Sequence, residues 1–198
     1  MIYSSMSNTL AETGVSQSNF VEIDLSPEKV PEPLNAHRIN EGYFGLATFS
    51  PEMPYLLTYG LSDCKCLILY DEATKTGLMA HISLVHDLGA VIDKCLSSLN
   101  CNYSQVKVYV VEGSASETKE LPSWLKTAPP YWPTTEQLLA ALNQRNIRNI
   151  LLDSNREKSG LPRGVVLDLE SGEVKELDNT NGWTWSKEQD ITLNRHLE

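Results

Sequence analysis

The residues best suited to chemistry in this chain are a thiol and an imidazole, Cys64 and His81, and His81 follows Cys64 by 17 residues. An imidazole next to a thiol can take the thiol proton and later return it to a leaving group. Cys64 begins the apolar segment CKCLILYD (64–71), and His81 lies in the next one, GLMAHISL (77–84). If the two segments pair as a hairpin around residues 72–76, the start of the first meets the end of the second. We therefore expect Cys64 close to His81, with a histidine that only packs in the core as the competing interpretation.

A second thiol, Cys66, lies two residues deeper in the same segment. A nucleophile needs exposure at the end of a strand, where backbone N–H groups can also bind an oxyanion, and this favours Cys64 over Cys66. Zinc sites usually separate paired cysteines by two to four residues. Here one residue separates them, and no second pair lies at a matching distance. The sequence therefore predicts no metal, and no other cofactor is expected.

The elements that must position these residues are mostly strands. Polar turns such as SPEMP and DEATKTG separate short apolar segments, and three of the first four segments are close enough to form hairpins. The predicted strands are 43–48, 55–60, 64–71, 77–84, 106–111 and 147–153, and a hairpin over 164–177 turns at Ser171–Gly172.

Two helices are predicted. Apolar residues at i, i+3, i+4, i+7, i+8 and i+11 form one stripe over residues 88–99 and carry Cys95 inward. Thr134, with Gln137 three residues later, is a capping-box pattern, which predicts a helix over 135–146. Strands and helices do not alternate regularly, so the fold class is α+β with a mostly antiparallel or mixed sheet system rather than a doubly wound fold.

Composition excludes several classes of protein. The chain has 198 residues, 41% hydrophobic and 21% charged, which suits one globular domain. The net charge of −10 has no compensating basic run, so nucleic acid and anionic membranes are not expected partners. No apolar run approaches the roughly 20 residues that span a bilayer. The start of the chain lacks the regions of a secretory signal, so a cytoplasmic location with free thiols is expected, although a translocated effector would look the same.

The chain divides into three parts by amino-acid composition and by the predicted elements. Residues 1–38 are rich in Ser, Asn, Thr, Glu and Pro and are expected to form a flexible N-terminal arm. Residues 39–178 hold the predicted elements, with a long irregular connection at 113–133. Residues 179–198 form a C-terminal tail that contains Trp183 and Trp185.

The spacing around Cys64 resembles that of the chemoreceptor glutamine deamidases of chemotaxis, the CheD family. In that family a Thr precedes the nucleophilic Cys by six residues, and the catalytic His follows it by 17 within an Ala-His pair. Here TYGLSDC and LMAH have these spacings, and VVEGSAS and the segment 149–174 are similar to later motifs of the family. The matching positions are Thr58, Gly60, Cys64, Asp71, Gly77 and Ala80–His81. The resemblance covers about residues 40–178 and extends to N-terminal asparagine amidohydrolases and deamidating toxins.

The resemblance implies a sandwich of β-sheets with flanking helices and a cysteine amidohydrolase that acts on a protein glutamine side chain. Cys64 would attack the carboxamide carbon to form a thioester, His81 would move the proton, and Thr58 would orient the imidazole or the substrate. Backbone N–H groups around Ser62 and Asp63 would hold the oxyanion. The implied partner is a protein substrate, with a regulatory partner protein as a further possibility.

The chain departs from the family pattern in the turn before the thiol. The family has Gly-Ser-Cys, whereas this chain has Ser62-Asp63-Cys64. A carboxylate at Asp63 is expected to raise the pKa of the thiol and to oppose its activation. Asp153 and Arg163 lie where the family has polar groups on the substrate side, and a plain surface ion pair is the alternative. The competing function is a non-catalytic binding module that docks a partner protein around Cys64.

Overall fold

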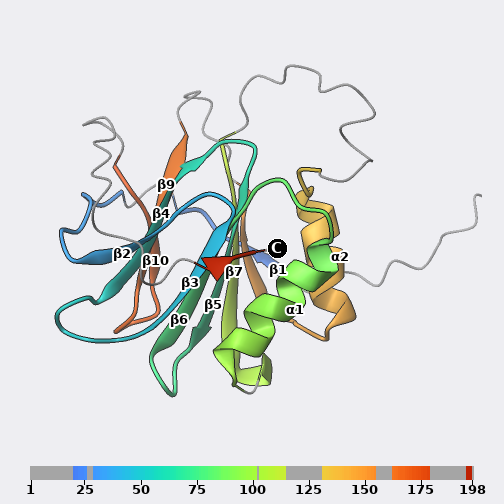
Figure 1. Ribbon diagram of the computed structural model, residues 1–198. Coiled ribbons are helices and arrows are strands. Elements are labelled where there is room, and N and C mark those ends of the chain that lie inside the picture. Colours follow the sequence, from blue (N-terminus) through green and yellow to red (C-terminus); the bar gives the residue numbers. More distant parts are fainter. Residues whose placement is uncertain are drawn as a thin grey trace, which may run out of the picture.

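The computed structural model describes residues 20–25, 29–101, 103–114, 131–154, 162–178 and 195–197. Figure 1 shows three layers: two helices cover one face of a seven-stranded sheet, and a four-stranded sheet lies against its other face. Most strand pairs are antiparallel. The α+β class expected from the sequence is confirmed.

The seven-stranded sheet has the order β1-β8-β7-β5-β6-β3-β11. β5 is central, and every residue in it is buried, which explains the unbroken apolar run from Cys66 to Tyr70 between Lys65 and Asp71. The predicted hairpin forms, with Lys65 opposite Ile82 and Cys66 opposite His81. The strands are β1 (Phe20–Glu22), β3 (Tyr43–Thr48), β5 (Lys65–Asp71), β6 (Thr76–Ile82), β7 (Val106–Glu112), β8 (Ile150–Asp153) and β11 (Arg195–His196).

The four-stranded sheet has the order β10-β9-β4-β2. Its strands are β2 (Ala36–Ile39), β4 (Tyr55–Leu61), β9 (Arg163–Asp168) and β10 (Val174–Glu176). β4 pairs with β2 in parallel and with β9 antiparallel, so it forms no hairpin with either neighbour in sequence. Of the hairpins that the first four apolar segments were close enough to form, β4 takes part in none, because β3 and β5 both lie in the other sheet. The hairpin of β9 and β10 is confirmed.

The helices form as the sequence predicts. α1 (Leu88–Leu99) buries the six residues of the predicted stripe, Cys95 among them. α2 (Thr135–Gln144) begins with the capping box of Thr134 and Gln137. A short 3-10 helix, η1 (Tyr103–Gln105), precedes β7. The helices pack on side chains of β5, β6 and β7, while alternate side chains of these strands face the four-stranded sheet.

The expected arm and tail are partly built into the fold. β1 pairs with β8, Val30 bridges to Leu177, and β2 pairs with β4, so the chain joins the sheets well before residue 39. The end of the chain also returns, because β11 pairs with β3 and Leu197 is buried. Residues 1–19, together with Trp183 and Trp185, lie outside the described residues. No helix among the described residues is long and apolar enough to cross a membrane.

Candidate active site

The candidate site lies where two connections pass from the four-stranded sheet to the seven-stranded sheet. β2 and β4 are parallel neighbours, with Ile39 opposite Thr58, so both strands leave their sheet at the same end. Residues 40–42 then lead to β3, and residues 62–64 lead to β5. The first connection is tied to the seven-stranded sheet by the N–H of Gly42, which donates to the carbonyl of His81 at 2.9 Å. Topology therefore brings two distant loops together over the same part of β6.

The turn before Cys64 is shaped by a bulge. The register between β4 and β9 shifts between Thr58 and Leu61, and Gly60 between them has φ +76, which glycine adopts without strain. The end of β7 holds the turn from the other side, because the N–H of Gly113 donates to the carbonyl of Cys64 at 3.1 Å. A side chain at Gly113 would lie 2.1 Å from the carbonyl oxygen of Ser62, so only glycine allows this approach. The turn is thus positioned by two glycines.

His81 is oriented by Thr58 across the space between the sheets. The Thr58 hydroxyl oxygen lies 2.7 Å from the carbonyl oxygen of Ile39 and 2.8 Å from Nδ1 of His81. A hydroxyl has one hydrogen and a carbonyl can only accept, so Thr58 donates to Ile39 and accepts from Nδ1–H. The neutral imidazole therefore carries its proton on Nδ1, and Nε2 keeps a free lone pair. Nε2 is buried and has no hydrogen-bond partner among the described residues.

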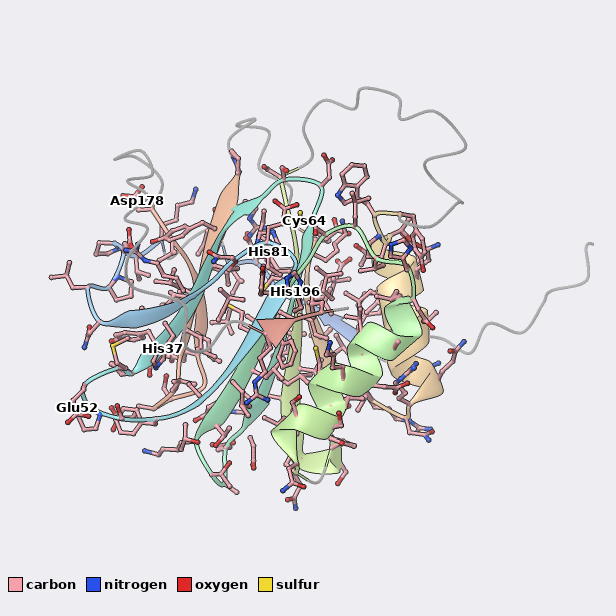
Figure 2. The ribbon with its side chains drawn as sticks, in the orientation of Figure 1. His37, Glu52, Cys64, His81, Asp178 and His196 are labelled. Carbon is pink, nitrogen blue, oxygen red and sulfur yellow. The ribbon has the colours of Figure 1, made fainter. Side chains whose placement is uncertain are left out.

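The thiol, the imidazole and a carboxylate come together at this point. One ligand atom each of Glu41, Cys64 and His81 lie within 4.8 Å of one another. Figure 2 shows Cys64 and His81 next to each other, near the N-terminal end of β5. Cys64 is 4% exposed and His81 1%, whereas Glu41, in the turn between β2 and β3, is exposed. The predicted proximity of Cys64 and His81 is found, and Glu41 marks the side of the pair that faces solvent.

Both partners rest in their neutral forms. Burial, followed by the charge of Glu41, raises the pKa of Cys64 to about 12, and Asp63 adds to the rise while Lys65 opposes it. Burial lowers the pKa of His81 to about 4. Desolvation disfavours the charged form of each group. At neutral pH the site therefore holds a thiol and an imidazole rather than a thiolate–imidazolium pair.

The backbone of the turn before Cys64 is held through its carbonyl groups. The carbonyls of Leu61, Asp63 and Cys64 accept hydrogen bonds from Ser114 N–H, from Lys65 Nζ and from Gly113 N–H. Within the part of the chain that the structure describes, the N–H groups of residues 62–64 find no acceptor. Unpaired N–H groups next to a nucleophile are what an oxyanion site requires. Ser62 and Asp63 precede Cys64 in this turn, and their role as oxyanion donors stays a prediction.

Cys66 is the direct cross-strand partner of His81, yet it is a core residue. Its side chain is 0% exposed, and burial raises its pKa. Side chains two apart on a strand share a face, so Cys64 and Cys66 both point into the core between the sheets. Only Cys64, at the end of the strand, has a route to solvent.

Arg163 and Asp153 form a buried ion pair, which corrects the interpretation as a plain surface pair. Arg163 Nη2 lies 2.7 Å from Asp153 Oδ2 and 2.7 Å from Glu176 Oε2, and all three side chains are at most 1% exposed. Lys29 Nζ lies 3.3 Å from the other oxygen of Glu176, so two cations balance two carboxylates. Arg163 Nη1 also donates to the carbonyl of Glu112 at 2.8 Å, next to the residue that holds the Cys64 turn.

Glu41 and Glu176 were not anticipated from the sequence. No sequence spacing identifies Glu41, because two strands, β3 and β4, separate it from Cys64 and it reaches the site only through the crossover from β2 to β3.

A cavity of about 430 Å³ lies elsewhere, between β10 and the residues that follow β1. It is lined by Ile23–Leu25, Tyr109, Leu151 and Glu173–Lys175. None of the site residues lines it, so it is not where a substrate would meet the thiol.

The charges at the site predict how fast Cys64 reacts. Glu41→Gln removes the carboxylate with the largest effect on the thiol, so we expect a lower pKa of Cys64 and faster labelling by iodoacetamide. Asp63→Ser should act in the same direction with a smaller effect. Labelling is followed from pH 6 to pH 10 (about the range around an ordinary thiol pKa near 8.5) in chelator-treated buffer. The native rate should still be rising with pH at the upper end, because the pKa of Cys64 is about 12.

Peptide mapping reads each cysteine separately, and the half-buried Cys101 is the internal reference. If Glu41→Gln leaves the Cys64 profile where it was, Glu41 does not restrain the thiol and the stated charge balance is wrong.

The chain was also compared with known proteins. No protein-family model matches it, and no curated protein matches it.

Proposed function

We propose that this protein is a cysteine amidohydrolase that converts a glutamine side chain of another protein into glutamate and ammonia. The observation that carries the proposal is the hydrogen bond from His81 Nδ1–H to Thr58, which leaves the lone pair of Nε2 free, in a histidine that has a ring nitrogen within 4.8 Å of the Cys64 sulfur. A base oriented by a third group is the common arrangement of activated nucleophiles. The expected similarity to the CheD family agrees with this arrangement, because its Thr, Cys and His positions are the residues that meet.

The reaction requires two proton transfers by His81. As the Cys64 sulfur forms a bond to the carboxamide carbon, Nε2 takes the thiol proton and the oxyanion is held by N–H groups of residues 62–64. The imidazolium then protonates the carboxamide nitrogen, and the C–N bond breaks. Ammonia departs, and the acyl group stays on the Cys64 sulfur as a thioester. Water attacks the thioester while Nε2 takes its proton, and the sulfur leaves with that proton as the thiol. Because the site rests neutral, proton transfer accompanies the attack rather than preceding it.

The test is a search for the product. Native protein and Cys64→Ala are each incubated with a cell lysate that contains candidate partner proteins. Peptide mapping then looks for glutamine residues whose mass has changed by the conversion of a carboxamide to a carboxylate. We expect converted sites with native protein only, together with released ammonia. Identical peptide maps for both proteins would refute the proposal. The same search finds conversion at asparagine, the related side chain.

The proposal includes a cytosolic place of action, because the four cysteines are free thiols and a reducing compartment keeps them so. It also includes a protein rather than a small amide as substrate, because the resembled family acts on protein side chains. A regulatory partner protein would act by uncovering the thiol, which is 4% exposed.

A second function is favoured by that same burial. In a non-catalytic module, Cys64 would serve only as a buried packing residue. Its 4% exposure and its pKa of about 12 fit that role. Such a module would dock a partner protein on the turns around Cys64 without changing it. It predicts that Cys64→Ala and native protein capture the same partner and that the partner's mass is unchanged in both.

Thr58→Val tests the role of the hydroxyl. The change keeps the shape of the side chain but leaves the buried Nδ1–H of His81 and the carbonyl of Ile39 without their partner. We expect a loss of about 1–3 kcal/mol in the free energy of unfolding. We also expect kcat to fall. The fall should be smaller than the ~10²–10⁴-fold rate contribution of a fully positioned acid–base group.

Thr58→Ser is the matched control, because it restores the hydroxyl. A positioning role requires that Thr58→Ser recovers kcat with little change in KM. Equal kcat for the Val and Ser variants would show that the hydroxyl does not orient His81.

A further inference from the structure

Three different metal-binding atom types converge on one point of the structure. The carboxylate of Glu41, the sulfur of Cys64 and a ring nitrogen of His81 lie within 4.8 Å of one another. Ligand atoms around one zinc ion lie about 3–4 Å apart, since Zn–S is about 2.3 Å and Zn–N about 2.0 Å. Glu41 is exposed and lies in a turn, so its side chain is free to rotate toward the other two ligands.

A second observation points to a ligand at this place. His81 is 1% exposed, and its Nε2 is buried without a hydrogen-bond partner among the described residues. A buried polar atom without a partner costs free energy, and most such atoms in proteins are satisfied by a protein group, water or an ion. His81 Nδ1–H meanwhile donates to Thr58, and the Thr58 hydroxyl donates to the carbonyl of Ile39. Metal-binding histidines commonly have their second nitrogen held in this way.

We propose that Glu41, Cys64 and His81 together bind a zinc ion, and that the bound ion blocks Cys64 as a nucleophile. The blocking rests on the proposed amidohydrolase activity, whereas the binding does not. Thiolate, imidazole and carboxylate are all zinc ligands, and three protein ligands leave the fourth tetrahedral position open. Thiolate coordination disfavours the hard ions Ca²⁺ and Mg²⁺, which take oxygen ligands.

The charges of the site suit a dication. When the Zn–S bond forms, the Cys64 thiol gives its proton to solvent. The thiolate and the Glu41 carboxylate then carry two negative charges against the two positive charges of zinc, and the imidazole stays neutral. The two negative ligands and the neutral imidazole thus match the charge of the ion.

The experiment titrates Co²⁺ into the full chain, because Co²⁺ takes tetrahedral zinc sites and absorbs light, whereas Zn²⁺ does not. We expect one cobalt ion per chain, with a sulfur-to-cobalt charge-transfer band that Zn²⁺ abolishes by displacement. Cys64→Ser should lose the band, and Glu41→Gln should weaken binding. Thr58→Val should weaken it by about 10–100-fold, the usual effect of removing the group that orients a metal-binding histidine.

Cys101→Ser is the matched control, because Cys101 is the most exposed of the four thiols and the band should not change when it is replaced. In native protein, Zn²⁺ should also protect Cys64, but not Cys101, from iodoacetamide, a readout that needs no variant to fold. The absence of a thiolate band, a band that survives in Cys64→Ser, or labelling of Cys64 that zinc leaves unchanged would each overturn the proposed site.

The two proposals can fail separately. Deamidation by chelator-treated protein without a cobalt band would leave the activity standing and refute the metal site. A cobalt band with the stated variant pattern, in a protein that converts no glutamine, would leave the metal site standing and refute the activity.

Discussion

Cys64→Ala is expected to abolish the conversion of glutamine, whereas Cys66→Ala keeps it. Cys64 is the only one of the two thiols with any exposed surface, at 4% against 0% for Cys66. The proposed oxyanion donors, the N–H groups of residues 62–64, also belong to the turn that leads into Cys64. Cys66 contacts the core between the sheets, so its loss costs stability on the order of 1 kcal/mol, as single substitutions commonly do.

The comparison is decisive because Cys66 is the direct cross-strand partner of His81. If position opposite the imidazole were enough, Cys66 would be the nucleophile. Ammonia release and intact mass measure both variants, and the trapped thioester should be found on the peptide of Cys64. Activity in Cys64→Ala equal to that of native protein would end the catalytic interpretation, and loss in Cys66→Ala alone would transfer it to the other thiol.

Arg163→Met is expected to lower the free energy of unfolding by about 3–5 kcal/mol, the usual cost of removing one partner of a buried ion pair. The Arg163 guanidinium contacts Asp153 and Glu176 at 2.7 Å each, and both carboxylates are at most 1% exposed. Methionine fills much of the same volume but leaves two buried charges with fewer partners. The change also removes the hydrogen bond to the carbonyl of Glu112, which precedes the Gly113 contact with the Cys64 turn.

Urea unfolding at neutral pH measures the loss, and Arg145→Met is the matched control. Arg145 also pairs with an acid, Asp93, but the Asp93 side chain is 65% exposed and solvent weakens the pair. The control variant should therefore unfold near the native midpoint. If Arg163→Met unfolds at the same urea concentration as Arg145→Met, the buried cluster does not stabilise the fold. Thiol labelling of Cys64 in native conditions shows whether the turn has loosened.

The sequence alone determined the elements whose causes are local. The apolar stripe over residues 88–99 corresponds to α1, and the capping box of Thr134 begins α2 where expected. The pairing of β5 with β6 follows from two apolar segments and a short turn, so the proximity of Cys64 to His81 was predictable. Side-chain periodicity and capping depend on residues a few positions apart, and the sequence displays these directly.

Only the tertiary structure decided which strands share a sheet. β4 lies between β3 and β5 in sequence but pairs with β2 and β9, because sheet partners are selected by the burial of whole faces. Segments that looked polar and loose, at residues 20–22 and 36–39, add strands to both sheets. Edge strands need few apolar residues, so composition alone described them as an arm.

The tertiary structure also decided the chemistry of the site. Thr58, which the family resemblance implied as a group that orients His81, reaches it from the other sheet, and Glu41 arrives through a crossover, so neither contact follows from the pairing of neighbouring strands. Burial sets the protonation of the pair, lowering the pKa of His81 to about 4 and raising that of Cys64 to about 12. Desolvation depends on everything packed around a group, which no local pattern of residues contains. Residue types and spacing could thus name a thiol and an imidazole, but packing alone decided that both rest uncharged.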